Sequence, residues 1–163
     1  MTKNVVVFDI DGCLVSNEHR LHLIKDKKWA EYFAAWEGDK PIAQGIVICR
    51  AFLRSKHYRV IFITSRSERS RETTLIQLQR FVDKKIKSTQ LFMRPNGVYD
   101  SARVAPSNAK GIVPDTELKL QLLKSAGYTP EDVFFLYEDK TATVETWRAQ
   151  GVVVLQPAVQ TDQ

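Results

Sequence analysis

Cysteine is scarce in this chain of 163 residues, which contains only Cys13 and Cys49. Two cysteines cannot form the disulfide framework of a small secreted domain, and both lie among apolar residues, so the sequence favours a reducing compartment. No apolar run approaches the length of a membrane span, and no signal-peptide region precedes the first apolar segment. We therefore expect a cytoplasmic protein that does not associate with membranes.

The chain also has only a small excess of positive charge. Lys and Arg number 24 and Asp and Glu number 19, which gives a formal net charge of +5 that is spread along the chain. This balance fits either a solvated basic surface or an anionic substrate such as nucleic acid, and composition does not decide between them. There is no internal repeat or low-complexity segment, and the length predicts a single domain over residues 1–163.

The chain does contain a short apolar run that ends in two acids, VVVFDIDGCL at residues 5–14. Continuous apolar runs are typical of parallel strands buried on both faces, so Asp9 and Asp11 should follow a central strand at the edge where α/β sheets bind ligands. Two such carboxylates attract a hard cation such as Mg²⁺, and Gly12 permits a tight turn. The alternatives are a simple acidic turn or a calcium loop, although the residues at 13–15 cannot ligate calcium.

The rest of the chain alternates strand-like and helical segments. This alternation predicts an α/β fold, a three-layer Rossmann-like parallel sheet with right-handed crossovers. Residues 17–40 carry aromatic residues at helical spacing and should form a small helical insertion after the first strand, with no large cap. Residues 95–114 should form a long loop. Further strands are expected at 58–64, 89–93, 133–137 and 152–155, and helices at 41–55, 68–81, 117–126 and 140–150.

Polar side chains follow two of these later strands. Thr64, Ser65 and Arg66 combine hydroxyl groups with a guanidinium group, which suits a phosphate, although Ser and Thr also cap helices. Glu138 and Asp139 form a second acidic pair at a strand end. The carboxyl ends of parallel strands share one edge of the sheet, so the two acidic pairs should converge on one metal ion.

The first motif resembles that of the haloacid dehalogenase-like phosphatase superfamily, a hydrophobic strand followed by Asp-x-Asp-Gly-Thr, with Cys13 in place of the threonine. The resemblance implies that Asp9 is the nucleophile and Asp11 the general acid/base. It also implies that Thr64 donates a hydrogen bond to the phosphoryl group. Lys119 would hold Asp9 and a phosphoryl oxygen.

Mg²⁺ is the implied cofactor, because four carboxylates cannot face a phosphate dianion without added positive charge. Asp11 would contribute its backbone carbonyl, and the sequence does not decide which acid of the later pair binds the ion. The candidate metal ligands are Asp9, Asp11, Glu138 and Asp139.

The chain is similar over nearly its whole length to the phosphatase domain of phage polynucleotide kinase/phosphatases. Its most specific part is Glu-Asp-Lys-Thr at 138–141 followed by Val-Glu-Thr-Trp-Arg at 144–148. In those enzymes the domain removes 3′-phosphates from nucleic-acid ends and accepts nucleotides. The substrate-binding residues expected here are Arg20, Ser65, Arg66 and Arg94.

The leading hypothesis is an Mg²⁺-dependent phosphatase, a phosphoric monoester hydrolase that acts on nucleotides or phosphorylated nucleic-acid ends through an aspartyl-phosphate. The chain contains no Gly-x-x-x-x-Gly-Lys-Ser/Thr loop, so it shows no kinase partner and need not keep the substrate of the fused enzymes. A small-metabolite phosphatase and a non-catalytic nucleic-acid-binding module are the alternatives. The sequence leaves open whether the substrate is a free nucleotide or a polymer end, and whether the chain forms a homo-oligomer.

Overall fold

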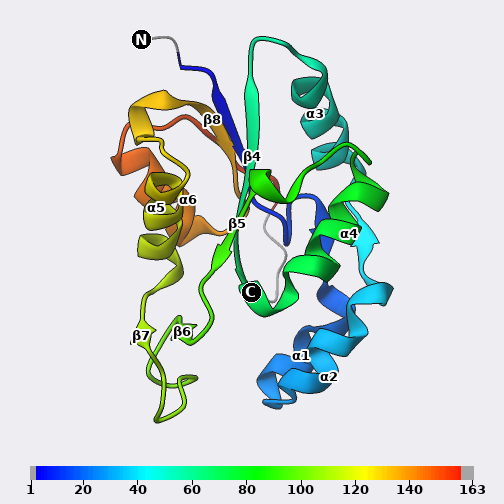
Figure 1. Ribbon diagram of the computed structural model, residues 1–163, viewed down its shortest axis with the longest axis vertical. Helices are drawn as coiled ribbons and strands as arrows, with labels where there is room; N and C mark the ends of the chain where they lie inside the picture. Colours follow the sequence, from blue (N-terminus) through cyan, green and yellow to red (C-terminus); the bar gives the residue numbers. More distant parts are fainter. Residues whose placement is uncertain (1–2, 159–163) are drawn as a thin grey trace.

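A five-stranded parallel sheet forms the centre of the structure, a computed structural model that describes residues 3–158 (Figure 1). The strand order is β5–β4–β1–β8–β9, so β1 lies in the middle with β4 and β8 as its neighbours. Every pairing in this sheet is parallel. The strands are β1 (Val5–Phe8), β4 (Arg59–Ser67), β5 (Leu91–Arg94), β8 (Val133–Tyr137) and β9 (Val154–Leu155).

Helices cover both faces of this sheet, which gives the molecule three layers (Figure 1). Val6 and Phe8 of β1 pack with residues of α3 and α4, whereas Val5 and Val7 pack with residues of α5 and α6. Both faces of β1 are therefore buried, which explains its continuous apolar sequence. The prediction of a three-layer α/β fold is confirmed. The helices are α3 (Ala43–Arg54), α4 (Arg71–Phe81), α5 (Asp115–Ser125) and α6 (Thr141–Ala149).

A small helical insertion follows β1, as the sequence predicts. Two short antiparallel strands, β2 (Val15–Ser16) and β3 (Lys40–Pro41), enclose it. Tyr32 is buried, and the rings of Trp29 and Phe33 pack edge-on against it at centroid distances of 6.4 and 5.5 Å, so part of the aromatic stripe serves packing. The helical segments are the 3₁₀ turn Glu18–Arg20, α1 (Leu21–Lys25), α2 (Trp29–Ala34) and the 3₁₀ turn Ala35–Gly38.

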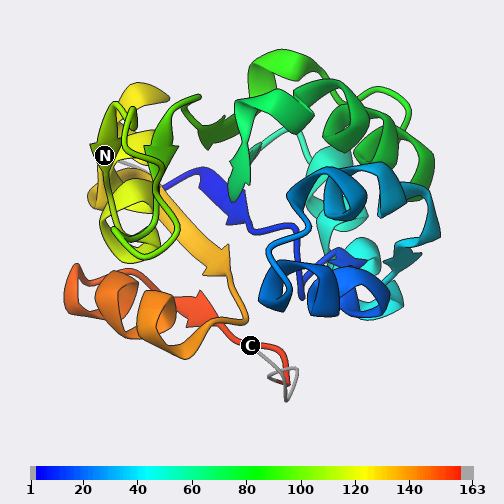
Figure 2. The ribbon, with the colours of Figure 1, turned by 90° about the horizontal axis from the view of Figure 1, so that it is seen from below.

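The insertion stands at the edge of the sheet where the strands end. The segment between β5 and α5 stands on the other side of that edge and contains β6 (Val98–Tyr99) and β7 (Gly111–Ile112), which pair in parallel. Figure 2 views this edge from below, with the blue insertion and the yellow-green β6–β7 segment on either side of the ends of β1 and β8. Both segments can therefore contact a ligand that approaches the strand ends. None of the helices in residues 3–158 is long and apolar enough to cross a bilayer.

Several element boundaries differ from those predicted, and two of them concern the candidate site. β4 continues three residues beyond the expected end at residue 64, so the hydroxyl and guanidinium groups at 64–66 lie within the strand, where its register against β5 shifts. The helix expected from residue 117 begins at Asp115, and Pro114 occupies the N-cap position. The Asp115 carboxylate accepts charge-assisted hydrogen bonds from Arg94 and Lys140.

Candidate active site

Asp9 and Asp139 meet at the carboxyl edge of the sheet. They follow the neighbouring strands β1 and β8, and the backbone N–H of Asp9 extends the pairing by donating to Tyr137 O at 3.0 Å. The carboxylates of Asp9 and Asp139 and the sulfur atom of Cys13 lie within 4.8 Å of one another, and all three residues are buried. The sheet therefore brings together acids from opposite ends of the chain.

Gly12 permits this close approach. Its φ angle is +78°, and a Cβ atom at this position would lie 2.0 Å from Asp139 Oδ2. A side chain at residue 12 would thus strain the backbone and collide with the carboxylate. The turn after β1 is shaped around the Asp139 side chain.

The two acids that follow β8, Glu138 and Asp139, differ in their contacts, because Lys119 of α5 binds only Glu138 of the two. Its Nζ atom lies 2.9 Å from Asp9 Oδ1 and donates to Glu138 Oε2 at 2.5 Å. Glu138 Oε1 accepts from the backbone N–H of Lys140 at 3.1 Å, so both Glu138 oxygens have partners. Asp139 Oδ2, in contrast, is buried and has no hydrogen-bond partner among residues 3–158.

Burial and crowding of like charges shift the pKa values in this cluster. Burial, reinforced by Glu138, raises the pKa of Asp9 to about 8, although Lys119 acts in the opposite direction. Burial and Asp9 raise the pKa of Asp139 to about 6. Burial alone would lower the pKa of Lys119, but the charges of Asp9 and Glu138 outweigh it and hold that pKa above its ordinary value. Burial and neighbouring like charges therefore both disfavour the ionised form of these two carboxylates.

These residues fit a hard divalent cation. Asp9, Glu138 and Asp139 offer three carboxylates against the single ammonium of Lys119, and a dication would balance the excess. The partnerless Oδ2 of Asp139 and the adjacent Asp9 carboxylate are the oxygen donors that this geometry favours, whereas Glu138 turns toward Lys119. The Cys13 thiol is a poor ligand for Mg²⁺, because burial raises its pKa and sulfur favours softer metals.

Asp11 turns away from this cluster and binds Arg66 through both carboxylate oxygens. The Arg66 Nε atom donates to Asp11 Oδ2 at 2.9 Å, and Nη2 donates to Oδ1 at 2.6 Å. Burial would raise the pKa of Asp11, but the Arg66 guanidinium outweighs burial and holds that pKa below its ordinary value. The Asp11 side chain is 25% exposed and that of Asp9 is 9% exposed, so solvent reaches the site mainly at Asp11.

Comparison with known families gives a match over almost the whole chain. Residues 3–161 match the family model described as the polynucleotide kinase PNKP phosphatase domain. The chain belongs to this family. A comparison with curated proteins finds no match.

Solved structures share the fold of this PNKP-type phosphatase domain at low sequence identity. A chain of the Pnkp1/Rnl/Hen1 complex matches with 20% identity and a TM-score of 0.66 over 96% of this chain, and the domain spans only 46% of that chain. The haloacid dehalogenase-like hydrolase SP0104 from Streptococcus pneumoniae matches with 13% identity and a TM-score of 0.61, over 94% of this chain and 83% of that one. A putative beta-phosphoglucomutase from Thermotoga maritima matches with 17% identity and a TM-score of 0.55, over 98% and 88%. The predicted membership of the haloacid dehalogenase-like superfamily is confirmed.

The PNKP-type domain places Thr64 and Ser65 on β4, directly beside β1. Thr64 Oγ1 accepts a hydrogen bond from the backbone N–H of Arg66 at 3.1 Å, and its own hydrogen has no acceptor among residues 3–158. That hydrogen is available to a substrate oxygen. Ser65 Oγ is buried and has no hydrogen-bond partner in the same part of the chain.

Two of the expected substrate-binding arginines instead lie in buried ion pairs of the PNKP-type domain. Arg20 Nη2 donates to Asp39 Oδ2 at 2.6 Å, and Arg94 Nη2 donates to Asp115 Oδ1 at 2.5 Å. Each arginine also donates to a backbone carbonyl, and Arg20 and Arg94 are 3% and 6% exposed. In this structure Arg20 therefore stabilises the insertion and Arg94 the β6–β7 segment, and the expected contact of each arginine with substrate stays a prediction.

The sequence analysis missed two polar residues that the domain brings to the site. Gln77 of α4 contacts Arg66, and Asp39, immediately before β3, contacts Arg20. Neither residue belongs to a motif recognised in the sequence, and only their positions in space mark them.

Proposed function

We propose that this domain is an Mg²⁺-dependent phosphatase that hydrolyses phosphate monoesters of nucleotides or phosphorylated nucleic-acid ends through an aspartyl-phosphate on Asp9. The observation that carries the proposal is the position of Asp9, which lies 2.9 Å from Lys119 Nζ and beside the partnerless oxygen of Asp139. A nucleophile for a phosphate dianion needs fixed positive charge on either side, and this position offers one ammonium and one cation site.

The reaction would run in two steps. In the first, an Asp9 oxygen attacks phosphorus, the bond from phosphorus to the ester oxygen breaks, and Asp11 gives that oxygen a proton. In the second, water attacks the aspartyl-phosphate, Asp11 accepts its proton, and inorganic phosphate leaves Asp9. The pair with Arg66 favours the ionised Asp11 that the second step requires, so the first step requires this pair to loosen as substrate binds.

The remaining residues would stabilise charge on the phosphoryl group. Lys119 would hold Asp9 and one phosphoryl oxygen, and the Thr64 hydroxyl would donate to another. Bound Mg²⁺, held by Asp9 and Asp139, would neutralise charge between the nucleophile and the phosphate. Asp11 would direct its backbone carbonyl, rather than its side chain, to the ion, because Arg66 occupies both side-chain oxygens.

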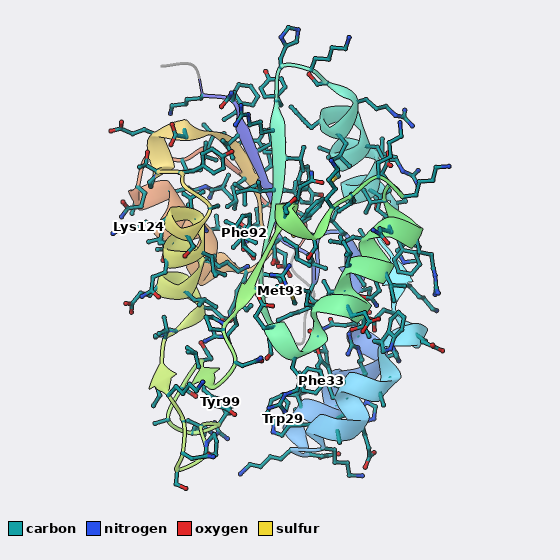
Figure 3. The ribbon with its side chains drawn as sticks, viewed as in Figure 1. Trp29, Phe33, Phe92, Met93, Tyr99 and Lys124 are labelled. Atoms are coloured by element: carbon teal, nitrogen blue, oxygen red, sulfur yellow. The ribbon has the colours of Figure 1, made fainter. Side chains whose placement is uncertain are left out.

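Two observations support a nucleotide or a nucleic-acid end as the substrate. The first is the family, whose description names polynucleotide kinase. The second is the carboxyl edge, where Trp29 of the insertion and Tyr99 of β6 stand on opposite sides (Figure 3). Trp29 is 38% exposed, and exposed aromatic rings can stack against bases.

The test is phosphate release with Mg²⁺ or with chelator, from deoxynucleoside 5′-monophosphates, 3′-monophosphates, a 3′-phosphorylated oligonucleotide and sugar phosphates. Asp9→Asn should lower release by about 10³-fold or more, and Asp26→Asn on the exposed surface of the insertion is the matched control. Release from the oligonucleotide with a KM that rises steeply with salt would identify a polymer end as the substrate. Absence of Mg²⁺-dependent release from every substrate would overturn the proposal.

A further inference from the structure

The guanidinium group of Arg66 is held on every side by protein atoms. Nε and Nη2 bind the two oxygens of Asp11, and Nη1 donates to Gln77 Oε1 at 2.6 Å and to Thr74 Oγ1 at 3.1 Å. Nη2 also lies 3.6 Å from Asp39 Oδ2. These contacts let Arg66 fix the Asp11 carboxylate, and the expected contact between Arg66 and substrate phosphate stays a prediction.

Gln77 of α4 fixes Arg66 in turn. Its side chain is 1% exposed, and its Oε1 accepts from Arg66 while its Nε2 donates to Asp39 Oδ2 at 2.8 Å and to Trp36 O at 3.0 Å. An amide is suited to this position, because it presents an acceptor to a cation on one side and a donor to a carboxylate on the other. An apolar residue of the same length could make neither contact.

Asp39 anchors the other end of this chain of contacts. Its side chain is fully buried and accepts from Arg20 through both oxygens, at 2.7 and 2.6 Å, in addition to the bond from Gln77. His19 Nε2 lies 2.9 Å from Asp39 Oδ1. A buried carboxylate with this many donors has little freedom to move, and it lies at the end of the insertion, immediately before β3.

We infer that Gln77 and Asp39 are positioning residues for phosphate hydrolysis: through Arg66 they hold the ionised Asp11 carboxylate at the orientation from which it accepts the proton of the attacking water in the second step. The inference rests on the proposed function. It gives the insertion a role in the proposed reaction, since Asp39 is linked to Asp11 through the side chains of Gln77 and Arg66. A misplacement of about 1 Å in a proton-transfer group can cost roughly 100-fold in rate.

The competing explanation is that Gln77 merely fastens the insertion to α4. The two explanations differ in which kinetic constant changes. A positioning residue acts on the chemical step, so its loss should lower kcat and leave KM nearly unchanged. If Gln77 only stabilises the insertion, its loss should lower the melting temperature and leave kcat of the folded fraction unchanged.

The test compares Gln77→Met with Gln79→Met on the same helix, where the wild-type side chain donates only to Ile86 O. We expect Gln77→Met to lower kcat by about 10- to 100-fold with KM changed less than about threefold, and Gln79→Met to change neither. Equal kcat in the two variants, or a loss confined to KM, would overturn the inference.

A second measurement reads the position of Arg66 without activity. The Arg66 Nε–H group is buried against Asp11 and should exchange slowly with water in the wild type, as followed by nuclear magnetic resonance. Exchange should become at least about tenfold faster in Gln77→Met and stay slow in Gln79→Met. Slow exchange in both variants, each of them folded, would overturn the inference. An inactive wild type with the expected exchange pattern would instead count against the proposed function alone.

Discussion

Lys119 Nζ lies 2.5 Å from Glu138 Oε2, and this contact separates the roles of two adjacent acids. Glu138 turns toward α5, where it balances the ammonium group. Asp139 is left beside Asp9 with one oxygen that has no partner among the described residues. This contrast favours Glu138 as the partner of the ammonium group and makes Asp139 the better candidate metal ligand of the two.

The first prediction concerns the metal. Asp139→Asn should remove most of the rise in melting temperature that Mg²⁺ gives the wild type, because it replaces the best-placed carboxylate ligand by a neutral amide. Glu138→Gln should keep most of that rise, yet lower kcat by about tenfold or more, because Lys119 loses its partner. Thermal unfolding over an Mg²⁺ titration measures both variants. Loss of the Mg²⁺ response in Glu138→Gln alone would reverse the assignment.

The second prediction concerns the turn at Gly12. Gly12→Ala should destabilise the protein and weaken Mg²⁺ binding, because the added Cβ would lie 2.0 Å from Asp139 Oδ2. The matched control is Gly151→Ala, where φ is +79° and nothing lies within 4 Å of the added atom. The control carries only the cost of positive φ, about 1 kcal/mol, and should bind Mg²⁺ normally. Stability is measured by denaturant unfolding and Mg²⁺ binding by titration. Equal effects of the two substitutions would show that Asp139 moves aside from the added Cβ atom without loss of stability or of Mg²⁺ binding.

The third prediction is a pH dependence of stability without metal. Burial raises the pKa of Asp9 in the folded state to about 8, above its unfolded value near 4, so the folded state binds more protons between these limits. Stability should fall as pH rises through this range, by up to about 1.4 kcal/mol per pH unit, and level off above pH 8. Asp9→Asn should not lose stability in this way, because asparagine does not ionise. In chelator its melting temperature should exceed that of the wild type by a margin that widens from pH 5 to pH 8.

Mg²⁺ supplies the control for that experiment. Added at pH 8, it should raise the melting temperature of the wild type and leave that of Asp9→Asn nearly unchanged, because the amide is a poor ligand for the ion. A margin that stays constant with pH in chelator would show that Asp9 is ionised throughout and that Lys119 alone offsets its charge.

The fourth prediction concerns the two thiols. Cys13 and Cys49 are both fully buried, and burial raises the pKa of each thiol above its ordinary value. Since the thiolate is the reactive form, neither should react with a thiol reagent at pH 8 in the native protein, and both should react in denaturant. Rapid labelling of one native thiol would show that the carboxyl edge opens around Cys13 or that α3, which carries Cys49, moves away from the sheet.

Much of the fold follows from local patterns. Apolar runs such as residues 5–8 and 60–63 favour burial on both faces, and they alternate with amphipathic segments, so a three-layer parallel sheet was predictable. The boundaries of the individual strands and helices were less predictable. Residues 64–66 read as the end of a strand, yet pairing with β5 carries the strand to Ser67. That extension depends on a neighbour from a distant part of the sequence.

The sequence by itself determined that acids follow β1 and β8, because strand-forming residues stop where polar ones begin, and parallel strands end at one edge. Only the tertiary structure decided which charge each side chain meets. Arg66 pairs with Asp11, and Arg20 with Asp39, since burial in a low-dielectric interior requires each charge to have a close partner. Those partners lie on other elements of the fold, and the distances between them exist only once the chain has folded.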